Sequence, residues 1–188
     1  MRRLGLLIAA AAAALLACQP AGEPSPRAAA AGAGSSTPAR VDRVVDGDTL
    51  VVRLGDGRRR RVRLIGIDTP ETKRPGSPVE CGGPQATALM LRLALRGEGR
   101  GVRGRDVVLV GDPSQDAADR YGRWLAYVDA TDGSGGNRDI GRALVEAGWA
   151  RAVAFDGPFR RQAAYGVAEA HARLRGRGIW GLCRGERR

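Results

Sequence analysis

Histidine and cysteine are scarce in this chain of 188 residues. The sequence holds one histidine and three cysteines. Protein zinc sites are built mainly from imidazole and thiolate ligands. The scarcity of both residue types therefore argues against a zinc site.

Large apolar residues are missing from Gln19 to Arg40. This segment has no valine, isoleucine, leucine, phenylalanine, tryptophan or tyrosine, and consists mostly of alanine, glycine, proline and serine. Such a composition cannot bury enough apolar surface to offset the entropy lost on ordering. We therefore interpret residues 19–40 as a disordered, flexible tether.

The first eighteen residues have the pattern of an export signal. Arg2 and Arg3 precede an apolar stretch that is shorter than the roughly 20 residues needed to span a bilayer. Cys18 follows Leu-Leu-Ala directly, as in the lipobox of bacterial lipoproteins, where the thiol is lipidated and the chain is cut before it. The pattern predicts a lipid anchor at Cys18 on a membrane facing the periplasm or the exterior. The alternative is ordinary secretion, with Cys18 incidental.

Residues 41–188 suffice for one ordinary domain with a single core. The formal net charge of the chain is +11. A positive charge favours polyanions, because neutralising phosphates releases their condensed counterions. Arginine far outnumbers lysine, however, and together with the heavy use of alanine and glycine this is also typical of GC-rich codon usage. Basicity alone is therefore weak support for nucleic-acid binding.

Two cysteines, Cys81 and Cys183, remain once Cys18 is set aside. In an exported protein such a pair favours a disulfide, here between an early loop and the C-terminal region. Closing a loop of about a hundred residues stabilises a domain by roughly 4 kcal/mol in the chain-entropy model. The alternative is two free thiols.

The first part of the domain favours β-strands. Partial alternation and β-branched residues predict strands over residues 41–45, 49–54 and 59–67, with a hairpin turn at Gly55-Asp56-Gly57. Two further strands are predicted over residues 106–110 and 125–128, and the Gly- and Arg-rich run 97–104 is predicted to be a loop.

Helical spacing of apolar residues predicts three helices: one from Pro84 to about Gly97, one over residues 140–147 and one over residues 159–174. Five strands and three helices indicate an α+β, mainly β fold. The architecture that suits them is a five-stranded Greek-key OB-fold barrel with three packed helices.

Four acidic residues lie in two tight clusters, each beside a strand end: Asp46 with Asp48, and Asp68 with Glu71. Hard oxygen ligands suit Ca²⁺ or Mg²⁺. Because strands converge at a barrel rim, Asp48 and Asp68 are expected to meet at one cation. Arg63 precedes Asp68 by five residues, which places the two on opposite faces of a regular strand. A bend or bulge, for which Gly66 is the natural place, would bring them together.

Each element of this pattern also has a simpler interpretation. Asp46-Gly-Asp-Thr49 is typical of an Asp-Gly turn, and Asp68-Thr-Pro-Glu71 of a turn or helix start. Arg63 and Arg123 taken singly suit a solvated strand position and a turn. The occurrence of both acidic clusters, twenty residues apart with Arg63 between them, favours a functional site.

These motifs resemble the staphylococcal nuclease family. Asp46-Gly-Asp-Thr49, Arg63, Asp68-Thr-Pro-Glu71, Asp119-Arg-Tyr-Gly-Arg123 and Ile179-Trp180 occur in the family's order, and the resemblance extends from Val41 to Trp180. The family implies a monomeric, Ca²⁺-dependent endonuclease that hydrolyses DNA and RNA with low sequence specificity and leaves 3′-phosphates.

The resemblance also implies roles for individual residues. Asp48 and Asp68 would give carboxylates, and Thr69 a backbone carbonyl, to Ca²⁺. Glu71 would deprotonate or orient the attacking water, while Arg63 and Arg123 would bind the scissile phosphate. Arg120 and Tyr121 correspond to positions that contact a terminal nucleotide phosphate.

The chain departs from the family after the second helix. Ala154 and Asp156 stand where the best-known member has two tyrosines that pack around the nucleotide. Stacking of a base on an aromatic ring is worth roughly 1–3 kcal/mol, so substrate preference is open. Phe155, Phe159 and Tyr121 are the candidates to compensate.

Two rival functions do not require catalysis. One is a nucleic-acid-binding OB-fold, as occurs when repeats of this family lose acidic residues. The other is a surface adhesion or structural lipoprotein, which would explain the tether and the disulfide. Retention of the acids and arginines in the motifs speaks against both.

Overall fold

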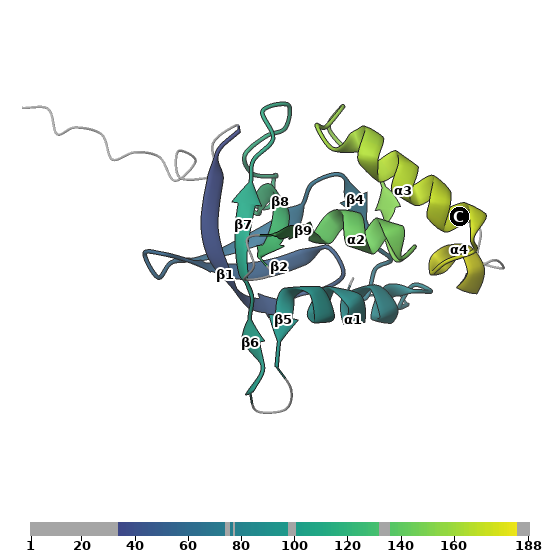
Figure 1. The fold of residues 1–188 in the computed structure, drawn as a ribbon, viewed down its shortest axis with the longest axis horizontal. Helices are drawn as coiled ribbons and strands as arrows, with labels where there is room; N and C mark the ends of the chain where they lie inside the picture. Colours follow the sequence, from purple (N-terminus) through teal and green to yellow (C-terminus); the bar gives the residue numbers. More distant parts are fainter. Residues whose placement is uncertain (1–33, 74–75, 77, 98–100, 132–135, 184–188) are drawn as a thin grey trace, which may run out of the picture.

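Five strands of the computed structural model close into a barrel (Figure 1). The structure describes residues 34–73, 76, 78–97, 101–131 and 136–183. The strands are β1 (Ser36–Val44), β2 (Thr49–Leu54), β3 (Arg59–Leu64), β7 (Asp106–Val110) and β8 (Trp124–Thr131). Their order is β3-β2-β1-β7-β8, and a parallel pairing of β3 with β8 closes the ring. The other four pairings of the ring are antiparallel.

Shorter strands and helices complete the fold. Strand β9 (Asn137–Asp139) extends the sheet beside β8, β4 (Ile67–Asp68) pairs with β10 (Arg151–Ala152), and β5 (Leu95–Arg96) pairs with β6 (Arg103–Gly104). The helices are α1 (Gly83–Ala94), α2 (Ile140–Glu146), α3 (Gln162–Leu174) and the single-turn α4 (Ile179–Leu182). The predicted mainly β barrel with three packed helices is therefore confirmed, with α4 as an addition.

The core lies inside the barrel and under the helices. The buried side chains of Leu50, Val52, Val62 and Leu64 on β2 and β3 point inward, whereas Arg53, Arg59 and Arg61 of the same strands are exposed. The helices add their apolar faces to this core, with Met90 from α1, Leu144 from α2 and Tyr165 from α3. The period-2 and helical patterns of the sequence correspond directly to these inward faces.

The structure corrects three predicted boundaries. Strand β1 begins at Ser36, so residues 36–40 belong to the barrel rather than to the tether. They pair with β7, and backbone hydrogen bonds order a segment that is poor in apolar side chains. The strand predicted over residues 59–67 ends at Leu64 and continues after a bend as β4. The predicted loop 97–104 includes β6.

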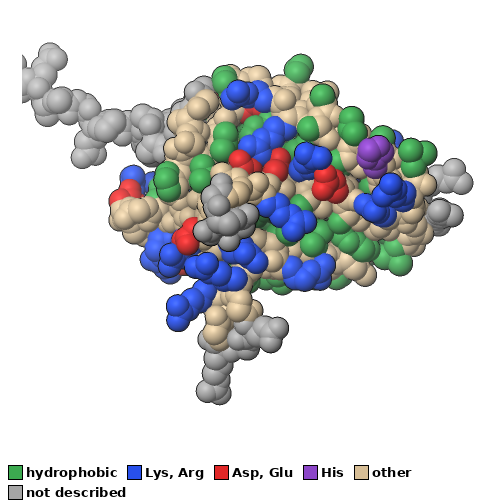
Figure 2. Space-filling view, in the orientation of Figure 1, with side chains coloured by type: hydrophobic (Ala, Val, Ile, Leu, Met, Phe, Trp, Pro, Cys, Tyr) green, Lys and Arg blue, Asp and Glu red, His purple; other side chains and the backbone are tan. Residues whose placement is uncertain are grey.

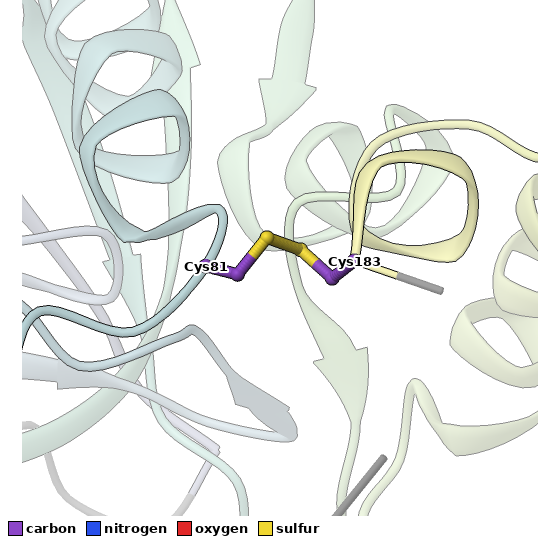
Figure 3. Close-up of a disulfide and its surroundings, with 2 residues drawn as sticks. All are labelled: Cys81 and Cys183. Carbon is purple, nitrogen blue, oxygen red and sulfur yellow. A yellow bond between two sulfur atoms is a disulfide. The ribbon is translucent and has the colours of Figure 1, made fainter. Parts of the chain in front are cut away.

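The disulfide between Cys81 and Cys183 is present and confirms the predicted pairing (Figure 3). Its Cα atoms are 5.9 Å apart and its cysteines are separated by 102 residues in sequence. It joins the segment before α1 to the end of α4. Cys18, with the predicted signal and most of the predicted tether, lies outside the described residues. Among those described, no helix combines the length and the apolar character needed to cross a membrane.

Candidate active site

The two acidic motifs pack directly against each other. Residues 46–49 form the tight turn between β1 and β2, where the backbone N–H groups of Val45 and Asp46 both donate to the carbonyl of Thr49. Asp48 accepts hydrogen bonds at Oδ2 from the backbone N (3.2 Å) and the Oγ1 (2.8 Å) of Thr69. A Cβ atom at Gly47 would lie 2.6 Å from Thr69 Oγ1, so this contact requires glycine.

Arg63 bridges one aspartate from each motif. Its Nη1 pairs with Asp48 Oδ2, and its Nη2 lies 3.1 Å from Asp68 Oδ1. The side chains of Arg63 and Asp48 are each 12% exposed, whereas that of Asp68 is 49% exposed. The expected meeting of Arg63 and Asp68 is therefore confirmed, and Arg63 also holds Asp48.

Gly66 makes this meeting possible, since its φ of +78° turns the chain between β3 and β4. A Cβ atom there would lie 2.4 Å from the ring of Phe159. We expect Gly66→Ala to lower the free energy of unfolding by about 3 kcal/mol, from backbone strain and overpacking together. Gly57→Ala is the matched control, because Gly57 has φ +82° but no heavy atom within 4 Å of an added Cβ. If urea unfolding shows equal losses of stability in the two variants, the clash with Phe159 adds nothing to the cost of the substitution at Gly66.

Two carboxyl groups of the site have raised pKa values. Burial raises the pKa of Asp68. The charge of Arg63 lowers this pKa, whereas the charge of Asp48 raises it further. Burial likewise raises the pKa of Asp46, and the charge of Asp48 adds to the effect. A cation beside these groups would stabilise their ionised forms.

The donor chemistry fits a hard cation. Asp48, Asp68 and the backbone carbonyl of Thr69 provide oxygen ligands of the type that Ca²⁺ prefers. In the part of the chain that the structure describes, no group of three or more His, Cys, Asp or Glu side chains is arranged to hold a metal. The remaining positions around a six- to eight-coordinate Ca²⁺ would therefore fall to water or a bound phosphate.

Glu71 lies three residues beyond Asp68, in a segment held by hydrogen bonds of its side chain and of its backbone. Its Oε1 accepts hydrogen bonds from the backbone N–H groups of Thr72 (2.9 Å) and Lys73 (2.8 Å). Its backbone N donates to Glu80 Oε2 at 3.1 Å, and the backbone N of Glu80 donates to its carbonyl at 2.9 Å. The segment is thereby fixed beside the start of α1.

Arg123 lies next to the strand that pairs with β3. It precedes β8, in which Leu125 lies opposite Arg63 in the parallel register. Asp119 holds it through Nε (2.7 Å) and through the backbone N (3.0 Å). Asp119 therefore positions Arg123, and a phosphate that binds Arg123 would have to compete with this carboxylate.

Arg120 and Tyr121 form an exposed group beside Arg123. Arg120 Nη2 donates to Tyr121 Oη at 2.7 Å, and the guanidinium of Arg120 stands 4.8 Å from the ring centroid. Arg123 stands 5.3 Å from the same ring. Tyr121 is 68% exposed, so the face of this cationic group is open to solvent.

The structure separates the three aromatic candidates. Phe159 is buried against Gly66 and cannot stack on a base. Phe155 is 60% exposed and lies 5.5 Å from the Arg63 guanidinium, at the mouth of a small pocket that Leu125 and Val153 also line. Sequence reasoning did not place Phe155, although an apolar ring between Ala154 and Asp156 in a loop was its signal.

Comparisons with known proteins show which family the chain is similar to. Residues 61–181 match the family model described as staphylococcal nuclease homologue. The chain is similar to the thermonuclease of Staphylococcus hyicus, with 32% identity over 177 residues, 94% of this chain and 95% of the relative. It is also similar to the thermonuclease of Staphylococcus intermedius (41% over 88 residues) and the endonuclease YncB of Bacillus subtilis (36% over 111 residues). These two matches cover 47% and 59% of this chain and 46% of each relative.

Proposed function

Because the chain belongs to the staphylococcal nuclease family, we propose that it is a Ca²⁺-dependent endonuclease that hydrolyses DNA and RNA with low sequence specificity. It is a nuclease, and therefore a hydrolase of phosphodiester bonds. The observation that best supports Ca²⁺-dependent cleavage is the bridging of Asp48 and Asp68 by Arg63. This contact brings acids from two separate motifs together with an arginine proposed to bind the scissile phosphate.

The arginines stabilise the charge that develops on the phosphate. Attack of water on a phosphodiester builds negative charge on the phosphoryl oxygens, and two guanidinium forks from β3 and the start of β8 can bind those oxygens. When bound beside Asp48, Asp68 and Thr69, Ca²⁺ would supply further positive charge at the same oxygens. Arg63 and Arg123 would exchange their acidic partners, Asp48 with Asp68 and Asp119, for the phosphate.

Glu71 is the carboxylate assigned to the attacking water. A carboxylate in this position takes the proton of the water or aligns its lone pair with phosphorus. Its fixed loop beside Asp68 limits where it can reach. With the 5′-oxygen leaving, the products would carry 3′-phosphates, and Arg120 with Tyr121 would contact the terminal phosphate.

Export and anchoring complete the proposal. A signal ending at Cys18 would deliver the domain outside the cytoplasm on a lipid anchor, where millimolar Ca²⁺ fills even a weak site. Retention of the domain in membranes of cells that express the full chain, and its release in Cys18→Ser, would test this part. Equal distribution of the two proteins between membrane and medium would contradict it.

The central experiment compares Ca²⁺ with EDTA. Purified protein is incubated with single-stranded DNA, double-stranded DNA and RNA in each condition, and the product ends are analysed for phosphate. Cleavage is expected only with Ca²⁺. Cleavage at the same rate in EDTA would overturn the metal dependence, and tight binding without cleavage would favour the non-catalytic rival.

Glu71→Gln is expected to lower kcat by about a hundredfold or more, because the amide can neither accept the proton nor carry the charge. Glu146→Gln is the matched control: Glu146 is an exposed glutamate on α2, paired with Arg142 at 2.7 Å. The control should keep the activity of the parent. An unchanged kcat in Glu71→Gln would remove Glu71 from the mechanism.

A further inference from the structure

A row of arginines runs along the outer face of β3 and ends at Arg63. Arg59, Arg61 and Arg63 alternate with Arg60 and Val62 along the strand, so all three project from the same side of it. Four residues of an extended strand span about 13 Å. The row therefore connects the candidate active site with the β2–β3 hairpin.

Neighbouring strands add arginines to the same face. Arg53 of β2 lies opposite Arg59, and Arg43 of β1 and Arg61 of β3 both lie opposite Val51. We call Arg43, Arg53, Arg59 and Arg61 the arginine track. In Figure 2, Lys and Arg side chains gather in the lower left of the view, between the β2–β3 hairpin at the left of Figure 1 and the β5–β6 hairpin at its bottom.

Few acidic side chains neutralise the arginine track. Asp42 pairs with both Arg53 (3.0 Å) and Arg59 (3.1 Å), so one carboxylate serves two guanidinium groups. Within the described residues, no carboxylate lies within ion-pairing distance of Arg43 or Arg61. The track therefore keeps an excess of positive charge.

A buried apolar side chain lies between two arginines of the track. Val51 belongs to this outer face and yet is only 7% exposed, with Arg43 and Arg61 on either side of it. Arginine stems cover apolar surface while their charged heads stay in water. Both heads are thus presented to solvent along a fixed strand.

We propose that the arginine track binds the phosphate backbone of single-stranded nucleic acid beyond the scissile bond and leads the strand to Arg63. Arg59, Arg61 and Arg63 form a single row along β3 that suits one backbone, flanked by Arg53 and Arg43, and arginine forks match phosphate oxygens. The track would give the enzyme a preference for long strands over short ones. This inference rests on the proposed function, which concerns the cleaved bond alone.

The test compares Arg59→Gln/Arg61→Gln with the charge-matched control Arg142→Gln/Arg173→Gln, whose arginines are each 55% exposed and lie on α2 and α3. Binding of a labelled single-stranded dodecamer is measured in EDTA at several salt concentrations. Removing two phosphate contacts should reduce the slope of log K against log[salt] by about 1.4. The control should keep the slope of the parent. Melting temperatures close to the parent's establish that both variants are folded.

A kinetic arm uses Ca²⁺ and two substrates, the dodecamer and a dinucleotide with one phosphodiester. The ratio of kcat/KM for the dodecamer to that for the dinucleotide should fall about tenfold in the track variant and stay unchanged in the control. If the parent cleaves both substrates, and if the kcat/KM ratio and the salt slope are the same in the parent, the track variant and the control, the track is overturned. The proposed function would still stand. A parent that cleaves neither would overturn the proposed function, while the salt slopes would still decide the track. Loss of binding to anionic phospholipid vesicles without loss of dodecamer binding would also overturn the track, in favour of a membrane surface.

Discussion

Arg63→Gln is expected to lower the rate of cleavage by about a thousandfold or more and to destabilise the metal-free protein by about 3 kcal/mol. The loss of rate follows from removing a guanidinium that binds the scissile phosphate in the proposed mechanism. The loss of stability follows from the structure, because Arg63 alone bridges Asp48 and Asp68 among the described residues. Without it, a buried carboxylate and its neighbour would face each other uncompensated.

Calcium separates the two effects of this variant. An ion that binds the folded state beside Asp48 and Asp68 stabilises it by linkage, so Ca²⁺ should restore part of the lost stability but little of the activity. Urea unfolding with Ca²⁺ and with EDTA, alongside kcat at saturating Ca²⁺, measures both. Arg142→Gln is the control for loss of a paired surface arginine. A variant as stable as the parent in EDTA would contradict the bridging role.

Loss of the Cys81–Cys183 disulfide is expected to lower the free energy of unfolding by about 4–5 kcal/mol. The bond closes a loop of about a hundred residues, for which the chain-entropy model gives about 4.7 kcal/mol. Cys81→Ser/Cys183→Ser is compared with the parent by urea unfolding, with Cys18→Ser in both proteins so that no third thiol interferes.

Reductant provides the internal control for this comparison. The parent should fall to the stability of the double variant when reduced, and the variant should not respond. A reduced parent that stays as stable as the oxidised one would show that the native packing of α4 holds the C-terminal region without the bond. Activity is expected to persist in the variant at low temperature, because the bond joins α4 to the segment before α1, whereas Arg63 is held by Asp48 and Asp68.

Much of the fold could be predicted because alternation, turn residues and helical spacing are local signals. The β2–β3 hairpin at residues 55–57 and the apolar face of α1 are examples. The start of β1 at Ser36 could not, because its order comes from backbone pairing with β7, which side-chain composition does not record. The two-residue strands β4 and β10 are likewise defined by each other and not by their own residues.

The site shows the same division. The odd spacing of Arg63 and Asp68 predicted a bend, and Gly66 provides it. The second partner of Arg63, Asp48, and the position of Phe155 over the guanidinium depend on distant segments meeting in space. Sequence spacing cannot give such contacts, since they follow from strand register and barrel closure. The roles of Glu71, Arg123, Arg120 and Tyr121 in catalysis and binding stay predictions.

The parallel pairing of β3 with β8 has a consequence for how activity is acquired during folding. In the antiparallel sheet β3 is one edge, and the first half of β8 is left open at the other because β9 pairs only with residues 129–131. The contact of these two segments, Val62 with Trp124 and Leu64 with Ala126, joins residues about sixty positions apart. Long-range contacts of this kind form late, after the loop-closure entropy has been overcome by other pairings. Arg63 and Arg123 lie on opposite sides of that seam. A folding intermediate with the sheet formed but the seam open would therefore hold both arginines and cleave nothing, so recovery of activity during refolding would report the moment of barrel closure.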